Sequence, residues 1–114
     1  MPSNNYTTIQ SLDELDAIIS ENLGVLLYFS NAACNVGEAF EPKVQRLLEE
    51  EYPKIPFYYV DMNQTPAISA KYSVFVMPTI IVFFDGKETI KKSRHIGIAE
   101  LANAIRRPYS LIFD

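Results

Sequence analysis

Residues 76–86 read Val-Met-Pro-Thr-Ile-Ile-Val-Phe-Phe-Asp-Gly. From Thr79 to Phe84 the stretch holds only β-branched and aromatic residues, without the polar alternation of a half-exposed strand. Such a run is typical of a strand that is covered on both faces. Asp85-Gly86 is a hairpin turn signal, so we expect residues 88–93 to return as the antiparallel partner strand.

Two apolar runs earlier in the chain, residues 25–29 and 57–60, predict further buried strands. Helical periodicity fills the intervals between the strands. Ser11 to Glu14 has the form of a capping box that opens a first helix, and Thr65-Pro66 resembles a helix start with proline in its first position. Near the end of the chain, Pro108 is expected to stop the last helix.

The expected architecture is an α/β fold in one domain, residues 1–114, with a mixed central β-sheet flanked by helices on both faces. Alternating strands and helices in the first part predict parallel pairing, and the tight turn at residues 85–86 forces antiparallel pairing at the end. In chain order, the expected elements are a short edge strand at 6–9, a helix at 12–21, a strand at 25–29, a helix at 34–50 kinked at Pro42, a strand at 57–60, a helix at 66–72, strands at 79–84 and 88–93, and a helix at 99–106.

Composition excludes several classes of function. The chain of 114 residues has a net charge of −4, which disfavours nucleic-acid binding because that binding depends on Lys and Arg neutralising phosphates. No apolar stretch reaches the roughly 18 residues that span a bilayer, and the first residues lack the pattern of a signal peptide. With a single cysteine the chain closes no internal disulfide, so we expect a reducing compartment and a cytoplasmic protein.

One combination of residues resembles a known family. A buried strand is followed by Cys34, which opens a helix containing Pro42, and later by the segment Val76-Met77-Pro78-Thr79 that leads into the Asp-Gly hairpin. This order and spacing is similar to thioredoxin over nearly the whole chain. The resemblance implies a thioredoxin fold in which Pro78 is cis and faces Cys34 across a shallow groove. It also implies that the backbone of Met77 pairs with an extended partner peptide, which is recognition by strand addition.

The departures from the family pattern are as informative as the match. The family motif is Trp-Cys-Gly-Pro-Cys, and the matching residues here are Ala33-Cys34-Asn35-Val36-Gly37. The nucleophilic cysteine is therefore kept as Cys34, and Gly37 stands in place of the resolving cysteine. Tyr28 takes the position of the family's buried aspartate, Glu38 that of its lysine, and Ala33 that of its aromatic residue.

These residues predict what Cys34 can do. Thiol–disulfide exchange needs a thiolate, which a helix N-terminus favours. The charge of Glu38 and the desolvation by an apolar rim oppose it. Without a second cysteine, a mixed disulfide on Cys34 requires an external thiol for release. The chain is therefore at most a monothiol oxidoreductase, and it is not a self-contained dithiol oxidoreductase.

The apolar rim supports a second hypothesis. Val36, Phe75, Val76 and Met77 are expected to form this rim. The first three stand where thioredoxins carry small or polar residues, and a contiguous apolar patch usually marks an interaction site. The chain could accordingly be a redox-silent module that binds a protein, a peptide or a second copy of itself beside Pro78. The opposing interpretation is that the C-terminal residues 109–113 fold back over part of this rim.

The remaining candidates are expected to be structural. His95 is interpreted as structural or solvent-facing, because no Cys or His partner lies at metal-binding spacing. Asp61 and Glu88 are interpreted as loop or surface carboxylates. The aromatic residues of the strands are predicted to pack the core. The sequence thus indicates no metal and no cofactor, and its expected partners are a protein or a small thiol or disulfide. A cluster-binding role like that of monothiol glutaredoxins is disfavoured, because the Gly-Phe-Ser continuation of their motif is absent.

Overall fold

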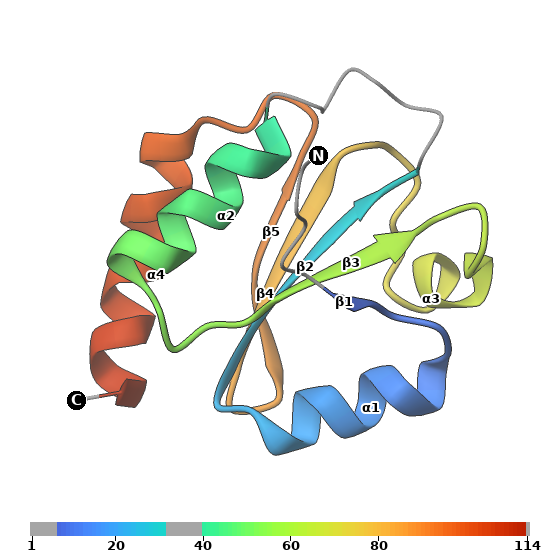
Figure 1. Ribbon diagram of the computed structural model, residues 1–114, viewed down its shortest axis with the longest axis horizontal. Coiled ribbons are helices and arrows are strands. Elements are labelled where there is room, and N and C mark those ends of the chain that lie inside the picture. The colour runs from blue at the N-terminus through green and yellow to red at the C-terminus, as the bar shows by residue number, and fades with distance from the viewer. Residues whose placement is uncertain (1–6, 32–39, 114) are drawn as a thin grey trace.

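A computed structural model describes residues 7–31 and 40–113 of the chain (Figure 1). Within them, a five-stranded sheet has the strand order β1-β3-β2-β4-β5. β1, β2 and β3 are parallel, whereas β4 runs antiparallel to both β2 and β5. The strands are β1 (Thr7–Thr8), β2 (Gly24–Ser30), β3 (Phe57–Asp61), β4 (Thr79–Phe84) and β5 (Lys87–Ser93). The expected thioredoxin fold, with its mixed sheet, is confirmed.

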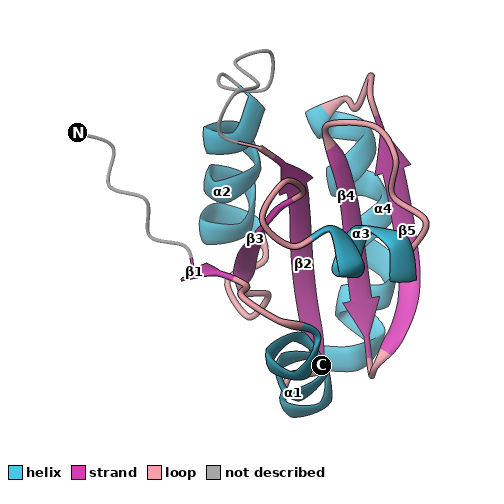
Figure 2. Cartoon of the chain, turned by 90° about the vertical axis from the view of Figure 1, so that its right-hand side faces the viewer, coloured by secondary structure: helices cyan, strands magenta, loops and turns pink. Residues whose placement is uncertain are grey.

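Four helices cover the two faces of the sheet. They are α1 (Leu12–Glu21), α2 (Phe40–Glu51), α3 (Pro66–Lys71) and α4 (Ile98–Phe113). α2 and α4 lie on one face, and α1 and α3 lie on the other (Figures 1 and 2). The predicted start of the second helix at Cys34 lies outside the described residues. Pro42 falls in the first turn of the described helix, so the kink predicted there stays a prediction.

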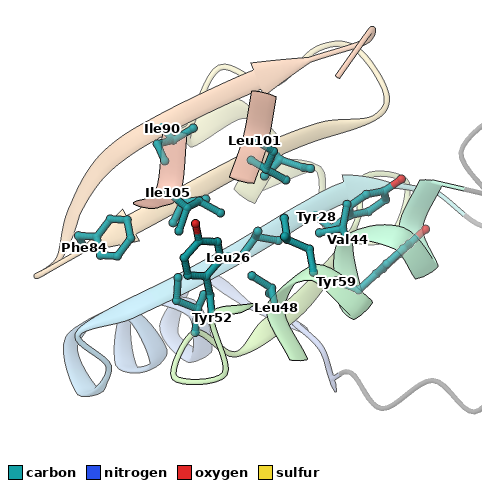
Figure 3. Close-up of a cluster of buried hydrophobic side chains, with 14 residues drawn as sticks. Leu26, Tyr28, Val44, Leu48, Tyr52, Tyr59, Phe84, Ile90, Leu101 and Ile105 are labelled. Carbon is teal, nitrogen blue, oxygen red and sulfur yellow. The ribbon is translucent and has the colours of Figure 1, made fainter. Parts of the chain in front are cut away.

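The position of β2 explains why its sequence does not alternate between apolar and polar residues. Leu26 and Tyr28 point into the core beneath α2 and α4, whereas Val25, Leu27 and Phe29 point into the core beneath α1 and α3. Because neighbouring side chains of a strand face opposite sides of the sheet, a strand covered on both faces is apolar at every position. Figure 3 shows the first of these cores, in which side chains of the sheet meet those of α2 and α4.

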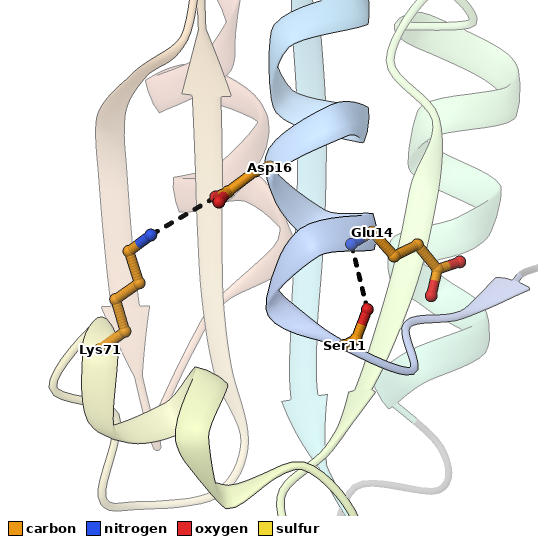
Figure 4. A network of polar contacts seen from close by, with 4 residues as sticks. All are labelled: Ser11, Glu14, Asp16 and Lys71. Carbon is orange, nitrogen blue, oxygen red and sulfur yellow. Dashed lines mark hydrogen bonds and ion pairs between the residues drawn. The ribbon is translucent and has the colours of Figure 1, made fainter.

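α1 and α3 carry polar contacts that involve the start of α1 and the end of α3. The hydroxyl of Ser11 accepts a hydrogen bond from the backbone N–H of Glu14 at 3.1 Å, as the capping box predicted. Lys71 at the end of α3 forms an ion pair with Asp16 of α1 at 3.4 Å (Figure 4). Both side chains of the pair are about half exposed, so it contributes little to stability. Packing against the shared core is what holds the two helices.

α4 contradicts the prediction that Pro108 ends the last helix. The helix continues through Pro108 to Phe113, although residue 108 has no N–H to donate to the carbonyl of Ala104. The residues beyond the proline explain the continuation. The ring of Tyr109 lies 4.8 Å from that of Tyr52 and 4.7 Å from that of Phe113, measured between centroids. Burial of these aromatic rings offsets the local cost of the proline.

Tyr52 also ties α4 to the end of α2. Its hydroxyl donates a hydrogen bond of 2.7 Å to the carbonyl oxygen of Ala102. Burial, and next the charge of Glu51, raise the pKa of Tyr52 above its ordinary value. A raised folded-state pKa means that the unfolded chain ionises first. The contribution of Tyr52 to the free energy of unfolding is therefore fully present below about pH 10, and it declines as the pH rises above that value.

Replacing Pro108 by alanine tests this account of α4. Proline is about 3 kcal/mol less favourable than alanine inside a helix. Alanine also makes the unfolded chain more flexible, which lowers the gain in folding stability by up to about 1 kcal/mol. We therefore expect Pro108→Ala to raise the free energy of unfolding by about 2 kcal/mol in urea denaturation. The exposed Leu111 of the same helix supplies the control, since Leu111→Ala should change stability little. A Pro108→Ala chain no more stable than the parent would contradict a continuous helix through this position.

Candidate functional site

The structure places one half of the predicted site. Ala33, Cys34, Val36, Gly37 and Glu38 lie outside the described residues. The Met77 and Pro78 half lies between α3 and β4, at the end of the sheet where β2 finishes. Phe29 of β2 pairs with Thr79 of β4, so the chain that leaves β2 toward Cys34 departs beside the chain that brings Pro78 into the sheet. The register of two buried strands therefore brings Pro78 beside the end of β2, where the described part of the chain stops at Asn31.

The segment from Phe75 to Pro78, here called the proline loop, is fastened to the sheet from both sides. The buried hydroxyl of Thr79 donates to the carbonyl of Val76 at 2.8 Å and lies 3.1 Å from the hydroxyl of Ser93. The N–H of Arg94 donates to the carbonyl of Pro78 at 2.9 Å. The peptide bond between Met77 and Pro78 is cis. These bonds hold the loop in one position relative to β4 and β5.

Met77 keeps its backbone groups available. Within residues 7–31 and 40–113, neither its N–H nor its carbonyl has a hydrogen-bond partner. The side chain is engaged instead, because the amide of Asn31 donates to the sulfur of Met77 at 3.1 Å. Backbone groups that are held in place but unpaired are what an added extended strand needs.

The proline loop exposes apolar surface. The side chain of Phe75 is 76% exposed and that of Met77 is 37% exposed, whereas Val76 is half-buried and Pro78 is buried. An aromatic ring left this open is unusual for a folded chain that has an apolar core to fill. Phe75 is therefore the strongest candidate for a contact with a partner among the described residues of the predicted rim.

The C-terminal residues do not cover the proline loop, so the interpretation that residues 109–113 fold back over the rim is wrong for the described part of the rim. The ring of Phe113 lies beside Gly24, close enough that a Cβ there would be 3.1 Å from it. Gly24 begins β2 and pairs with Phe84, at the far end of the strands that finish beside the proline loop. Six strand residues separate the two ends by about 20 Å. Figures 1 and 2 show the C-terminus at that opposite end.

Tyr28 belongs to the core. Its ring is buried and stacks on Phe57 at 5.7 Å and on Tyr59 at 6.1 Å, with Phe40 of α2 at 6.4 Å. The resemblance matches this position to a buried carboxylate that moves protons. An aromatic ring packed among three others contributes to the core instead. Any proton transfer at this end of the sheet therefore cannot use a carboxylate at position 28.

The carboxylates and the histidine are structural or solvent-facing. Asp61 was expected on a loop or at the surface, but it is only 7% exposed and ends β3. Its carboxylate accepts hydrogen bonds from the N–H groups of Asn63 and Gln64, which satisfies the turn into α3. Glu88 and His95 are exposed, as predicted. Among the described residues, no group of three His, Cys, Asp or Glu side chains could hold a metal ion, and no helix could cross a membrane.

Three contributors to the site were missed by the sequence analysis. Asn31 contacts Met77, Thr79 holds Val76, and the ammonium of Lys91 donates to the carbonyls of Tyr72 and Ser73 just before the loop. Asn31 and Thr79 could have been found, because each is a polar residue at the end of an otherwise apolar strand. For Lys91 there was no such signal, because the two carbonyls that it reaches lie 19 and 18 residues earlier in the chain.

Comparison with known proteins identifies a matching family and several similar proteins. The family model described as Thioredoxin matches residues 7–107. The chain is 25% identical to thioredoxin-like protein YdfQ of Bacillus subtilis, over 92% of this chain and 93% of that protein. It is 32% identical to thioredoxin of Mycoplasma genitalium, over 80% of this chain and 85% of that one. Fasciola hepatica thioredoxin superimposes with a TM-score of 0.79 at 30% identity, covering 89% of this chain and 97% of that one.

Replacing Thr79 by valine should loosen the proline loop. Valine keeps the shape of the side chain but leaves the carbonyl of Val76 without its donor, so we expect a loss of about 1–2 kcal/mol in the free energy of unfolding. Urea denaturation measures it. Thr89→Val is the matched control, because the hydroxyl of Thr89 is exposed and bonds only within its own strand. If both variants were as stable as the parent, the hydroxyl of Thr79 would not hold the loop.

Proposed function

This chain belongs to the thioredoxin family, and from that premise we propose that it works in thiol homeostasis by monothiol exchange through Cys34. Membership of the family supports a redox-related role. The finer proposal rests on one combination of features. The nucleophile's position is kept as Cys34, the resolving position is Gly37, and the backbone of Met77 beside Pro78 has no hydrogen-bond partner among residues 7–31 and 40–113.

The proposed reaction has three exchange steps. The thiolate of Cys34 attacks one sulfur of a partner disulfide, forms a mixed disulfide and releases the partner's other sulfur as a thiolate. An external thiolate then attacks the sulfur of Cys34, which frees the partner in its reduced form and leaves the external thiol bound to Cys34. A second external thiol releases Cys34. Each partner disulfide reduced thus consumes two external thiols, which leave joined as one disulfide.

The proline loop would supply the positioning for this reaction. An extended partner segment could pair with the N–H and carbonyl of Met77, while Phe75 packs against an apolar side chain of the partner. We propose Cys34 as the reacting residue, with Ala33, Val36, Phe75, Val76, Met77 and Pro78 forming the contact surface. The partners would be a protein disulfide and a small thiol, in a cytoplasmic setting, with no cofactor.

The exposure of Phe75 favours one alternative. In it, the chain is a redox-silent module that uses the proline loop and its apolar rim to hold a protein, a peptide or a second copy of itself. The substitutions at the family's motif positions fit this alternative equally well, because Gly37, Tyr28, Glu38 and Ala33 all replace residues that serve exchange. The two hypotheses differ in whether the sulfur of Cys34 is needed.

The reactivity of Cys34 tests the exchange chemistry itself. We expect the alkylation rate of Cys34 by iodoacetamide to rise with pH and to reach half its maximum below about pH 8.5, the value for an unperturbed thiol. We also expect a mixed disulfide to form when the chain is mixed with a disulfide such as oxidised glutathione, as read by intact mass. A midpoint at or above that of a free thiol, together with no mixed disulfide, would exclude monothiol exchange.

Two substitutions separate exchange from binding. In a strain that depends on this protein under oxidant stress, exchange predicts that Cys34→Ser abolishes growth, and binding predicts that Phe75→Asp does so while Cys34→Ser does not. Leu111→Asp is the matched control, because Leu111 is 74% exposed, close to the 76% of Phe75, and lies on α4 instead of the proline loop. Loss of growth in Cys34→Ser but not in Phe75→Asp would rule out the binding module.

A further inference from the structure

Met77 combines two properties beyond its proposed contact with a partner. The residue is 37% exposed at the proline loop, and its sulfur accepts a hydrogen bond of 3.1 Å from the amide of Asn31. The amide nitrogen therefore lies against one side of the sulfur. A thioether sulfur has two lone pairs, so this hydrogen bond engages one of them and leaves the other for a reagent that reaches the exposed side chain.

We propose that Met77 is a site of reversible oxidation to methionine sulfoxide, and that Asn31 directs the reaction to one of the two sulfoxide epimers. The oxidant is a peroxide. The open lone pair of the sulfur attacks one peroxide oxygen, a sulfur–oxygen bond forms and the oxygen–oxygen bond breaks. The second oxygen leaves as water when the peroxide is hydrogen peroxide. Sulfur loses the two electrons that the peroxide gains.

The position of Asn31 explains the expected stereochemistry. Asn31 follows directly on the last residue of β2, where Ser30 pairs with Asp61 of β3. The backbone of Asn31 is therefore anchored next to a paired strand end, and its amide covers one side of the sulfur. Attack from the open side gives one configuration at sulfur. Separate reductases repair the two epimers, so the configuration also decides which enzyme restores Met77.

Oxidation would change the surface that the proposed partner meets. A sulfoxide is polar, whereas the thioether of Met77 lies in the same loop as the exposed ring of Phe75. The new oxygen adds a strong hydrogen-bond acceptor to a surface that is otherwise apolar. This consequence, weaker docking at the proline loop, rests on the proposed function, whereas the oxidation itself does not.

The test treats the full chain, and its Cys34→Ser variant to remove competition from the thiol, with hydrogen peroxide. Peptide mass spectrometry reads the sulfoxide at each methionine, and repair by a reductase specific for either epimer reads the configuration. We expect Met77 to oxidise several-fold faster than Met62, which is half-buried against the core beneath α1 and α3. We also expect one epimer in several-fold excess at Met77, and a nearly even mixture after Asn31→Ala.

The outcomes separate this inference from the proposed function. Equal oxidation of Met62 and Met77, an even mixture in the parent chain, or an excess unchanged by Asn31→Ala would overturn it, whatever Cys34 does. The docking consequence is measured without oxidant, as the rate of mixed-disulfide formation in Met77→Gln and Met77→Leu. We expect the polar variant to be several-fold slower than the apolar one. Equal rates would remove the consequence for docking.

Discussion

The rest of the structure depends on the burial of β2 on both faces. All seven residues of this strand are buried, and it lies between β3 and β4 in the middle of the sheet. Because its side chains alternate between two cores, a shift of one residue would exchange the contents of those cores. The register is therefore fixed, and with it the position of Asn31 at the strand's end and of Thr79 opposite Phe29. The proline loop sits where these two buried strands place it.

The candidate site combines a preserved scaffold with altered chemistry. The bonds from Thr79 and Arg94 hold the proline loop, and the backbone of Met77 makes no hydrogen bond within the described part of the chain. Against this, a glycine occupies the resolving position, and Tyr28 brings an aromatic stack in place of a carboxylate. The scaffold can be kept while the reactive groups change, because the two depend on different interactions. Positioning follows from strand register and hydrogen bonds, whereas resolution of a mixed disulfide needs a second sulfur atom.

Most of the fold could be predicted because its strands and helix starts depend on local patterns. The runs at residues 25–29, 57–60 and 79–84, the Asp-Gly turn and the Ser11 cap each carry their signal within a few residues. α4 could not be predicted beyond Pro108, because its last turn depends on Tyr52, more than 50 residues away, whose ring meets that of Tyr109. Asp61 was misjudged for a similar reason. Its burial follows from the turn that its own carboxylate organises.

The candidate site could be predicted less completely than the fold. Met77 and Pro78 were proposed from the family motif, and the exposure of Phe75 agrees with the apolar rim expected from its neighbours. The contact between Asn31 and Met77 was not predictable, because 46 residues separate the two and nothing in either local sequence pairs an amide with a sulfur. Likewise, only the three-dimensional path of α4 shows that residues 109–113 lie far from the rim.

The most direct test of the central claim is a disulfide reduction assay on insulin, run with and without an added small thiol such as glutathione. Monothiol exchange predicts turnover above the rate of the thiol alone when both are present, and no more than one exchange event per Cys34 when the thiol is left out. Turnover without the thiol would contradict the dependence on an external resolving sulfur. No acceleration beyond the thiol alone would contradict exchange through Cys34.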